Sequence, residues 1–236
     1  MRKLSKKTIA LLAAAAVLFA GGGAAGTRAV LNIYSPDYYI DFATDDQDVA
    51  VVENSAVVSG SNSMLGDLSG KVIPGKTYTE EIAAKNTSGS DQYVRLVIRK
   101  YWVLPGEDAS NKSYAARNLD PGMIKLELAN GSGWTRNSSE STDEREVYYY
   151  SSIVPSGGVT NAVTTTLSVD GEVLKETSTT TKDNVITFSY LYDGYQIAIE
   201  AEAQSIQTHN ADEAIKSIWG VQNVSVSGST LLVSNN

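Results

Sequence analysis

The sequence lacks cysteine altogether, and this absence excludes disulfides, thiolate metal ligands and a lipid anchor on cysteine. It holds a single histidine, His209, so the second imidazole that zinc peptidase sites use is also missing. Neither a His-Glu-x-x-His motif nor a Gly-x-Ser-x-Gly motif occurs. No second apolar stretch follows the N-terminal one. These absences predict a non-enzyme without catalytic, cofactor-binding or metal-ligating residues.

The first 29 residues have the three parts of a secretory signal peptide. A basic start precedes an apolar run from Thr8 to Ala20, and small residues fill most of Gly21–Ala29. The apolar run is shorter than the about 20 residues of a membrane span. We therefore expect residues 1–29 to form a signal helix that is cleaved between Ala29 and Val30. Residues 30–236 are then secreted, and the chain meets the membrane only before cleavage.

Basic residues are scarce in the mature chain. The leader contains five cations and no acids, so its removal leaves 14 basic and 27 acidic residues, a net charge of −13. Such a surface repels nucleic acid and anionic lipid, which excludes both as partners. It also opposes self-association, and salt or divalent cations would weaken that repulsion.

Beyond residue 30 the apolar residues recur with a period of two, which predicts strands. In 93–99, one face carries Val94, Leu96 and Ile98, and the other carries Arg95 and Arg99. The run 195–205 alternates between Tyr195, Ile197, Ile199, Ala201 and Ala203 on one face and Gln196, Ala198, Glu200, Glu202 and Gln204 on the other. One face is expected in a core and the other in water, as in antiparallel sheets.

Turn residues separate these strands. Asp170-Gly171 is predicted to join strands at 165–169 and 172–176 in a tight hairpin, and Asp193-Gly194 to join 185–192 to 195–205. Pro74-Gly75 predicts another reversal. One helix is predicted, with Asn210 as its cap, Glu213 three residues on, apolar Ala214, Ile215 and Ile218, and Gly220 as its terminator. The sequence thus predicts a single all-β domain over 30–236, an antiparallel β-sandwich with one short C-terminal helix.

Acidic side chains offer weak candidate sites. Glu200 and Glu202 are expected to be solvated on the outer face of their strand. Two acidic loops could bind calcium but lack the residue order of a dedicated calcium loop: Asp45-Asp46-Gln47-Asp48 and Glu140-Ser141-Thr142-Asp143-Glu144. Solvated loops are the favoured interpretation of both.

Tyrosine is plentiful, and a row of exposed rings on a sheet would form a platform for sugars. The candidates are Tyr38, Tyr39, Tyr148, Tyr149, Tyr150, Tyr190, Tyr192 and Tyr195. Tyrosine is also a good strand former, and alternation would bury about half of such a run. Exposure of Tyr148, Tyr150 and Tyr192 on one flat face would favour a glycan-binding module or adhesin.

Several short segments, in order, resemble one family. They are Gly26-Thr27-Arg28-Ala29 at the end of the leader, Val72–Gly89 with its Pro-Gly and Lys-Asn-Thr turns, Tyr93–Ile98, Tyr148–Tyr150 with Val154–Thr160, and Ile197–Gly220. Together they cover most of the mature chain. The chain resembles the TasA/camelysin family of Firmicutes, whose leaders are cut by a SipW-type signal peptidase.

The resemblance implies a jelly-roll-like sandwich and a structural role in fibres of the biofilm matrix or the cell surface. Its partners would be other copies of the chain, related fibre subunits and, before cleavage, the SipW-type signal peptidase. The family also carries a metallopeptidase label from camelysin, which is a less favoured alternative because this chain has one histidine.

The resemblance to fibre-forming relatives also suggests how copies would join. Cleavage frees residues 30–42, a candidate donor strand for the sheet of the next subunit, with Val30, Leu31, Ile33, Tyr38, Ile40 and Phe42 as its apolar residues. The alternative is that 38–42 is the first strand of the chain's own sandwich. Both hold if the segment exchanges between subunits.

Overall fold

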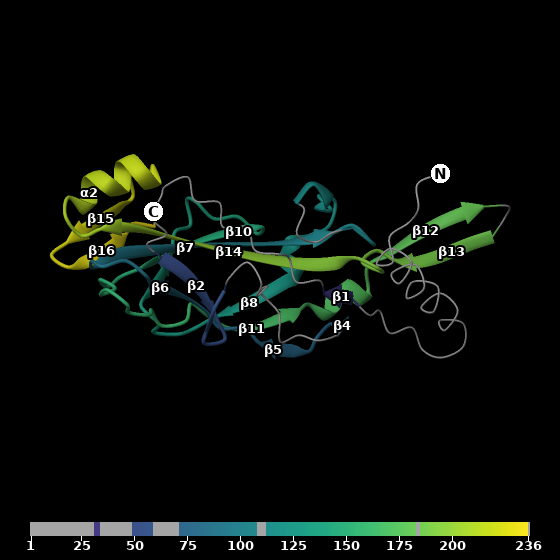
Figure 1. Ribbon diagram of the computed structural model, residues 1–236. Coiled ribbons are helices and arrows are strands. Elements are labelled where there is room, and N and C mark those ends of the chain that lie inside the picture. The colour runs from purple at the N-terminus through teal and green to yellow at the C-terminus, as the bar shows by residue number, and fades with distance from the viewer. Residues whose placement is uncertain (1–30, 34–48, 59–70, 108–111, 183–184, 236) are drawn as a thin grey trace, which may run out of the picture.

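The structure is a computed structural model and describes residues 31–33, 49–58, 71–107, 112–182 and 185–235. The described chain is mostly β, its sheets are antiparallel apart from one strand pair, and one short helix lies near the C-terminus. These features confirm the all-β, antiparallel class and the short helix. Figure 1 shows an elongated molecule with that helix at one end.

The largest sheet has six strands. Its order is β4 (Lys71–Val72), β1 (Leu31–Ile33), β14 (Gln196–Gln207), β7 (Gln92–Val103), β10 (Arg145–Tyr150) and β9 (Trp134–Arg136). β7 and β14 pair along their full length, from Gln196 opposite Val103 to Gln207 opposite Gln92. β1 is parallel to β14.

Four smaller sheets complete the described strands. Two of them have three strands. One has the order β5 (Thr77–Thr79), β11 (Thr164–Val169) and β8 (Ile124–Leu128). The other has the order β3 (Ala56–Val57), β2 (Val49–Glu53) and β6 (Ile82–Asn86). The two-stranded sheets are β12 (Thr177–Lys182) with β13 (Val185–Tyr190), and β15 (Val224–Ser227) with β16 (Thr230–Val233). Single 3₁₀ turns span Lys112–Tyr114, Pro121–Met123 and Gly171–Leu174.

The main core lies on the predicted apolar face of the long strands. Val94, Leu96 and Ile98 of β7 and Ile197 and Ile199 of β14 are almost completely buried there. Facing side chains come from the smaller sheets, among them Val51, Ile82, Ile124 and Leu167. The period-two prediction for this face is confirmed.

The opposite face does not meet water as predicted. The C-terminal segment covers one end of it and builds a second core with Tyr93, Val97, Val147, Tyr149 and Ile206. Near the other end Tyr101, Val103 and Ala198 are buried against Tyr114 and Ala115. Arg95 and Gln196 are therefore buried too, at 7% and 3% exposure. Alternation predicts which residues share a face but not whether a later segment covers that face.

The helix consists of α2 (Ala211–Ala214) followed by a π-helical turn, Ile215–Trp219. Gly220 ends it with φ of 70°, as predicted, whereas Asn210 is left-handed and makes no capping hydrogen bond. Ile218, expected on the apolar face, is 67% exposed, while Trp219 is buried at 6%. The π turn widens the spiral and brings Trp219 rather than Ile218 under the helix.

Two predicted hairpins are wrong. Asp170 accepts a hydrogen bond from the Glu172 backbone N–H (3.0 Å) and starts a 3₁₀ turn, so residues 172–176 form no strand. Asp193-Gly194 does turn, with Gly194 at φ of 79°, but β13 pairs with β12 and β14 pairs with β7 and β1. Pro74-Gly75 is confirmed as a reversal, since Gly75 has φ of 79° and Lys76 N–H bonds Ile73 O at 3.0 Å.

Replacing Trp219 by alanine should lower the free energy of unfolding by about 3–5 kcal/mol, because it empties the centre of the second core. Ile218→Ala is the matched control, and its effect should stay within about 0.5 kcal/mol since the side chain is exposed. Chemical denaturation measures both. Equal losses would contradict the packing described for the C-terminal segment.

Candidate functional site

The predicted signal peptide and its cleavage site, Ala29 and Val30, lie outside the described residues. So do Tyr38, Ile40 and Phe42 of the candidate donor strand, together with Tyr39 and the acidic loop at 45–48. Leu31 and Ile33 are described and belong to β1. In the described part of the chain no helix is long and apolar enough to span a membrane.

β1 lies inside the six-stranded sheet, between β14 and β4. Asn32 is opposite Gln196 and Ile33 is opposite Ile197, while Leu31 and Asn32 face Val72 and Lys71 of β4. This pairing covers only the beginning of β14. Among the described residues, no strand pairs with that edge of β14 from Ala198 to Gln207.

The side chains along this edge are small and buried. Ala201 and Ala203 are 2% and 0% exposed and point into the main core beside Ile199. An edge of backbone N–H and C=O groups is the part of a sheet to which an added strand can bond. We call Ala198–Gln207 the β14 edge.

A cluster of side chains lies on the face of the sheet that does not line the main core. We call it the Arg95 cluster, and its members are Arg95, Asn137, Glu140, Tyr149, Gln204 and Trp219. The Arg95 guanidinium donates to Gln204 Oε1 (2.6 Å) and Tyr149 Oη (3.0 Å) and lies 3.4 Å from Glu140 Oε1. Its carbon is 5.2 Å from the centroid of the Trp219 ring, within range of a cation–π contact. The cluster joins the helix to the sheet.

Glu140 belongs to this cluster, which corrects its expected solvation. Its carboxylate accepts hydrogen bonds from Tyr149 Oη (2.6 Å) and Asn137 Nδ2 (2.7 Å) as well as facing Arg95. Asp143 and Glu144 point away into solvent. No three His, Cys, Asp or Glu side chains gather at metal-binding distance anywhere in the described ranges. His209 is exposed beside the start of α2.

Glu200 and Glu202 are half-buried and ion-paired, which corrects their expected solvation. Glu200 lies 2.7 Å from Lys112 Nζ and accepts from Tyr101 Oη at 2.7 Å, and Glu202 lies 3.6 Å from Arg99 Nη1. Sequence alternation placed them on the correct face. Their cationic partners come from the neighbouring strand β7 and from residue 112, which no local pattern predicts.

The tyrosines do not form an exposed row. Tyr148 and Tyr192 are buried in the main core. Tyr149 is buried in the second core, because neighbouring residues of β10 point to opposite faces of the sheet. Tyr150 is half-buried with its ring 5.1 Å from that of Trp134, and Tyr190 and Tyr195 are also half-buried. The flat platform that would favour glycan binding is therefore not made by Tyr148, Tyr150 and Tyr192.

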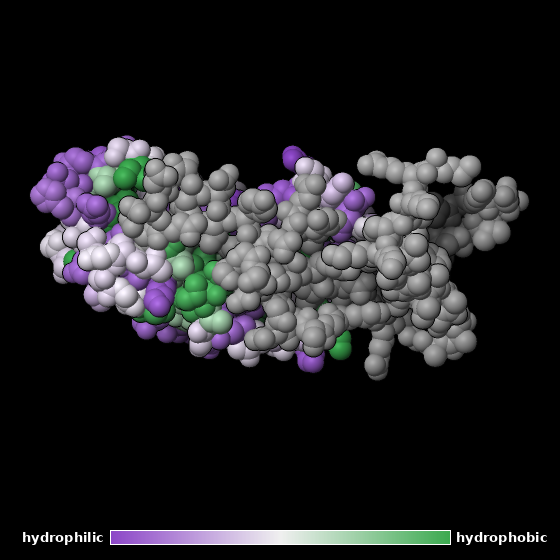
Figure 2. All heavy atoms as spheres, in the orientation of Figure 1, coloured by the Kyte–Doolittle hydropathy of each residue, from purple (hydrophilic) through white to green (hydrophobic). Residues whose placement is uncertain are grey.

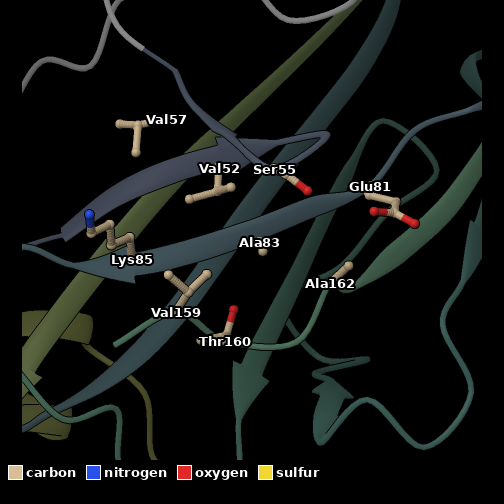
Figure 3. A pocket seen from close by; sticks show the side chains of 9 residues that line it. All are labelled: Val52, Ser55, Val57, Glu81, Ala83, Lys85, Val159, Thr160 and Ala162. Atoms are coloured by element: carbon tan, nitrogen blue, oxygen red, sulfur yellow. The ribbon is translucent and has the colours of Figure 1, made fainter. Parts of the chain in front are cut away.

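An open groove of about 350 Å³ crosses the outer face of the sheet β3-β2-β6. Val52, Val57, Ala83 and Val159 give it an apolar lining, and a hydrophobic patch is visible near the position of β2 (Figure 2). Glu81 and Lys85 lie at its opposite ends (Figure 3). These two charges do not converge, so the groove is not arranged for acid–base chemistry.

Comparison of the chain with protein-family models, curated proteins and solved structures finds no match.

The Arg95 cluster predicts a specific pattern of stability. Arg95→Met should lower the free energy of unfolding by about 1–3 kcal/mol, because it leaves the Glu140 carboxylate, whose side chain is 17% exposed, without its cation. Adding Glu140→Gln to that variant should recover part of the loss. Lys175→Met, which removes an exposed pair with Glu172, is the control and should cause no measurable change. A double variant no more stable than Arg95→Met would refute this explanation.

Alkaline pH should destabilise the protein. Burial, together with a hydrogen bond to Glu140, raises the pKa of Tyr149 to about 12, and burial also raises the pKa of Tyr101 and Tyr148. A raised pKa means that the native state holds the proton more tightly, so this stability is complete below pH 10 and is lost as pH rises through the native pKa values. Denaturation midpoints measured from pH 9 to 12 should fall, and the fall should be shallower in Tyr149→Phe.

Proposed function

We propose that the chain is an exported structural subunit of an extracellular matrix or cell-surface fibre, without catalytic activity. In this proposal a SipW-type signal peptidase removes residues 1–29, and the mature domain, a jelly-roll-like sandwich as in the TasA/camelysin family, assembles with its own copies or related subunits. Assembly uses exchange of the N-terminal strand. The observation that carries the proposal is the β14 edge, which lies directly in line with β1.

The position of β1 supports exchange. β1 begins one residue after the predicted new N-terminus and keeps only Asn32 and Ile33 in register with β14. β1 is held by these two pairs with β14 and by two pairs with β4. A strand held by so few pairs loses little when it leaves its own sheet, and it regains the same pairs in an identical neighbour. The chain end that cleavage frees is therefore the part that is easiest to exchange.

The remaining residues of the donor strand fit the β14 edge if the strand contains one bulge. Pro36 is the natural position, since proline cannot donate to a ladder and is tolerated at bulges. One extra residue there would place Tyr38 opposite Ala201 and Ile40 opposite Ala203. Large donor side chains would then lie beside the two small buried side chains of β14.

The free energies involved favour an interface that combines side-chain burial with backbone hydrogen bonds. Three buried anchors, Tyr38, Ile40 and Phe42, would contribute about 1.5–3 kcal/mol each. Association costs about 4–15 kcal/mol, so these anchors are marginal by themselves. Backbone hydrogen bonds along the β14 edge, at about 0.5–1.5 kcal/mol each, would decide the outcome.

Purified 30–236 should form elongated assemblies in electron micrographs, and should form them faster in salt or calcium because these screen the acidic surface. The same chain without residues 30–42 should remain a folded monomer. A peptide of residues 30–42 should slow assembly of 30–236 by occupying the β14 edge.

Two peptide variants sharpen this test. Ile40→Asp removes an anchor and should abolish the inhibition, whereas Tyr39→Asp changes the opposite face of the donor and should largely retain it. A chain 30–236 that stays monomeric at high concentration across ionic strengths would end the fibre proposal. Inhibition by both variant peptides alike would refute the register.

A further inference from the structure

The loop between β8 and β9 carries the dipeptide Asn130-Gly131 at its tip. No other asparagine in the chain precedes a glycine. Asn130 and Gly131 are both exposed, and Gly131 has φ of 68°. A Cβ built on Gly131 would meet no atom within 4 Å, so the tip is surrounded by open space.

The residues on either side of this tip are held by hydrogen bonds. The Ala129 N–H donates to Val163 O at 2.9 Å, and Ser132 O accepts from Asn161 Nδ2 at 3.0 Å. Asn130 and Gly131 are the two residues between these held points.

The polar groups of the tip itself are not held. Among the described residues, neither the Asn130 side-chain amide nor the Gly131 backbone N–H makes a hydrogen bond. Glycine also has no side chain to shield its nitrogen, and it adopts more backbone conformations than other residues. The Gly131 nitrogen can therefore approach the Asn130 side chain with little resistance.

Asn118 provides a comparison within the same chain. Its side chain is also exposed, but the next residue, Leu119, is buried and its N–H donates to Ala116 O at 3.2 Å. Asn137 differs further, because it is buried and the N–H of Ser138 is hydrogen-bonded to a side-chain oxygen at 2.9 Å. In both cases an acceptor holds the backbone nitrogen that follows the asparagine.

We propose that Asn130 is a site of spontaneous deamidation in the folded chain. The Gly131 nitrogen attacks Asn130 Cγ, and the new N–Cγ bond closes a succinimide ring. The side-chain nitrogen leaves as ammonia, taking the proton from the Gly131 N–H. Water then opens the ring at either of its carbonyl carbons and gives aspartate or isoaspartate at this position. Water is the only co-reactant.

The modification changes the loop and leaves the sheets in place. Either product adds one negative charge, which takes the mature chain from −13 to −14. Isoaspartate also lengthens the main chain by one carbon atom. The open space around Gly131 accommodates that atom, whereas at Gly133 a Cβ would already come within 3.1 Å of the Tyr150 ring.

Peptide mass mapping of purified 30–236, incubated in mildly alkaline buffer, tests the proposal. The peptide that contains Asn130 should gain one mass unit and separate into two chromatographic forms, aspartate and isoaspartate. The peptide that contains Asn118 is the internal control and should stay unchanged. Gly131→Ala should slow the reaction by about tenfold, or about 1.4 kcal/mol in its barrier, because a Cβ hinders the attacking nitrogen. Asn130→Gln should abolish the mass gain at this position.

A synthetic peptide of residues 126–136 separates the reactivity of the dipeptide from the effect of the fold. The folded chain and the peptide should react at similar rates, since the tip is not held. The proposal is overturned if Asn130 stays unmodified in the folded chain while the peptide reacts. It is also overturned if Asn118 reacts equally fast, or if Gly131→Ala reacts as fast as the unchanged chain. The reaction needs no second copy, so its outcome is independent of fibre assembly.

Discussion

The long antiparallel ladder between β7 and β14 determines most of what surrounds it. Its twelve residue pairs set the length of the six-stranded sheet and fix which side chains face the main core. Both faces of the ladder are covered in part, so polar residues on the second face need partners inside the protein. The Arg95 cluster and the ion pairs of Glu200 and Glu202 supply them. Burial of this kind holds charges in one arrangement because an unpaired buried charge is costly.

Local patterns predicted the strands well and their partners poorly. The alternation around Val94, Leu96 and Ile98 was sufficient to identify β7 and its core face, since period two is a property of each strand. Turn residues were less informative. Asp170 caps a 3₁₀ turn instead of closing a hairpin, and Asp193-Gly194 separates strands that pair elsewhere. Pairing across the sheet is decided by the whole chain, which no dipeptide encodes.

For the candidate site residues, too, the sequence predicted local features but not their partners. The position of Glu140 in an acidic loop predicted a solvated or calcium-binding side chain, but its carboxylate contacts Arg95 of β7 and Tyr149 of β10. Tyr148 and Tyr192 looked suited to an exposed platform and are core residues instead. Tyr149 lies on the other face of the sheet and is buried in the second core. The residues that cover it, Ile215 and Trp219, belong to the C-terminal segment.

Strand edges give a physical account of how such a subunit would assemble. Edges at β6 and β9 are closed by other parts of the chain, whereas the β14 edge offers small buried side chains beside the short strand β1. Hydrogen–deuterium exchange of the mature chain, before and after assembly, tests this account most directly. It predicts that amide exchange within 198–207 slows strongly in assemblies while exchange in β9 stays unchanged. Unchanged exchange along the β14 edge in fully assembled material would contradict it.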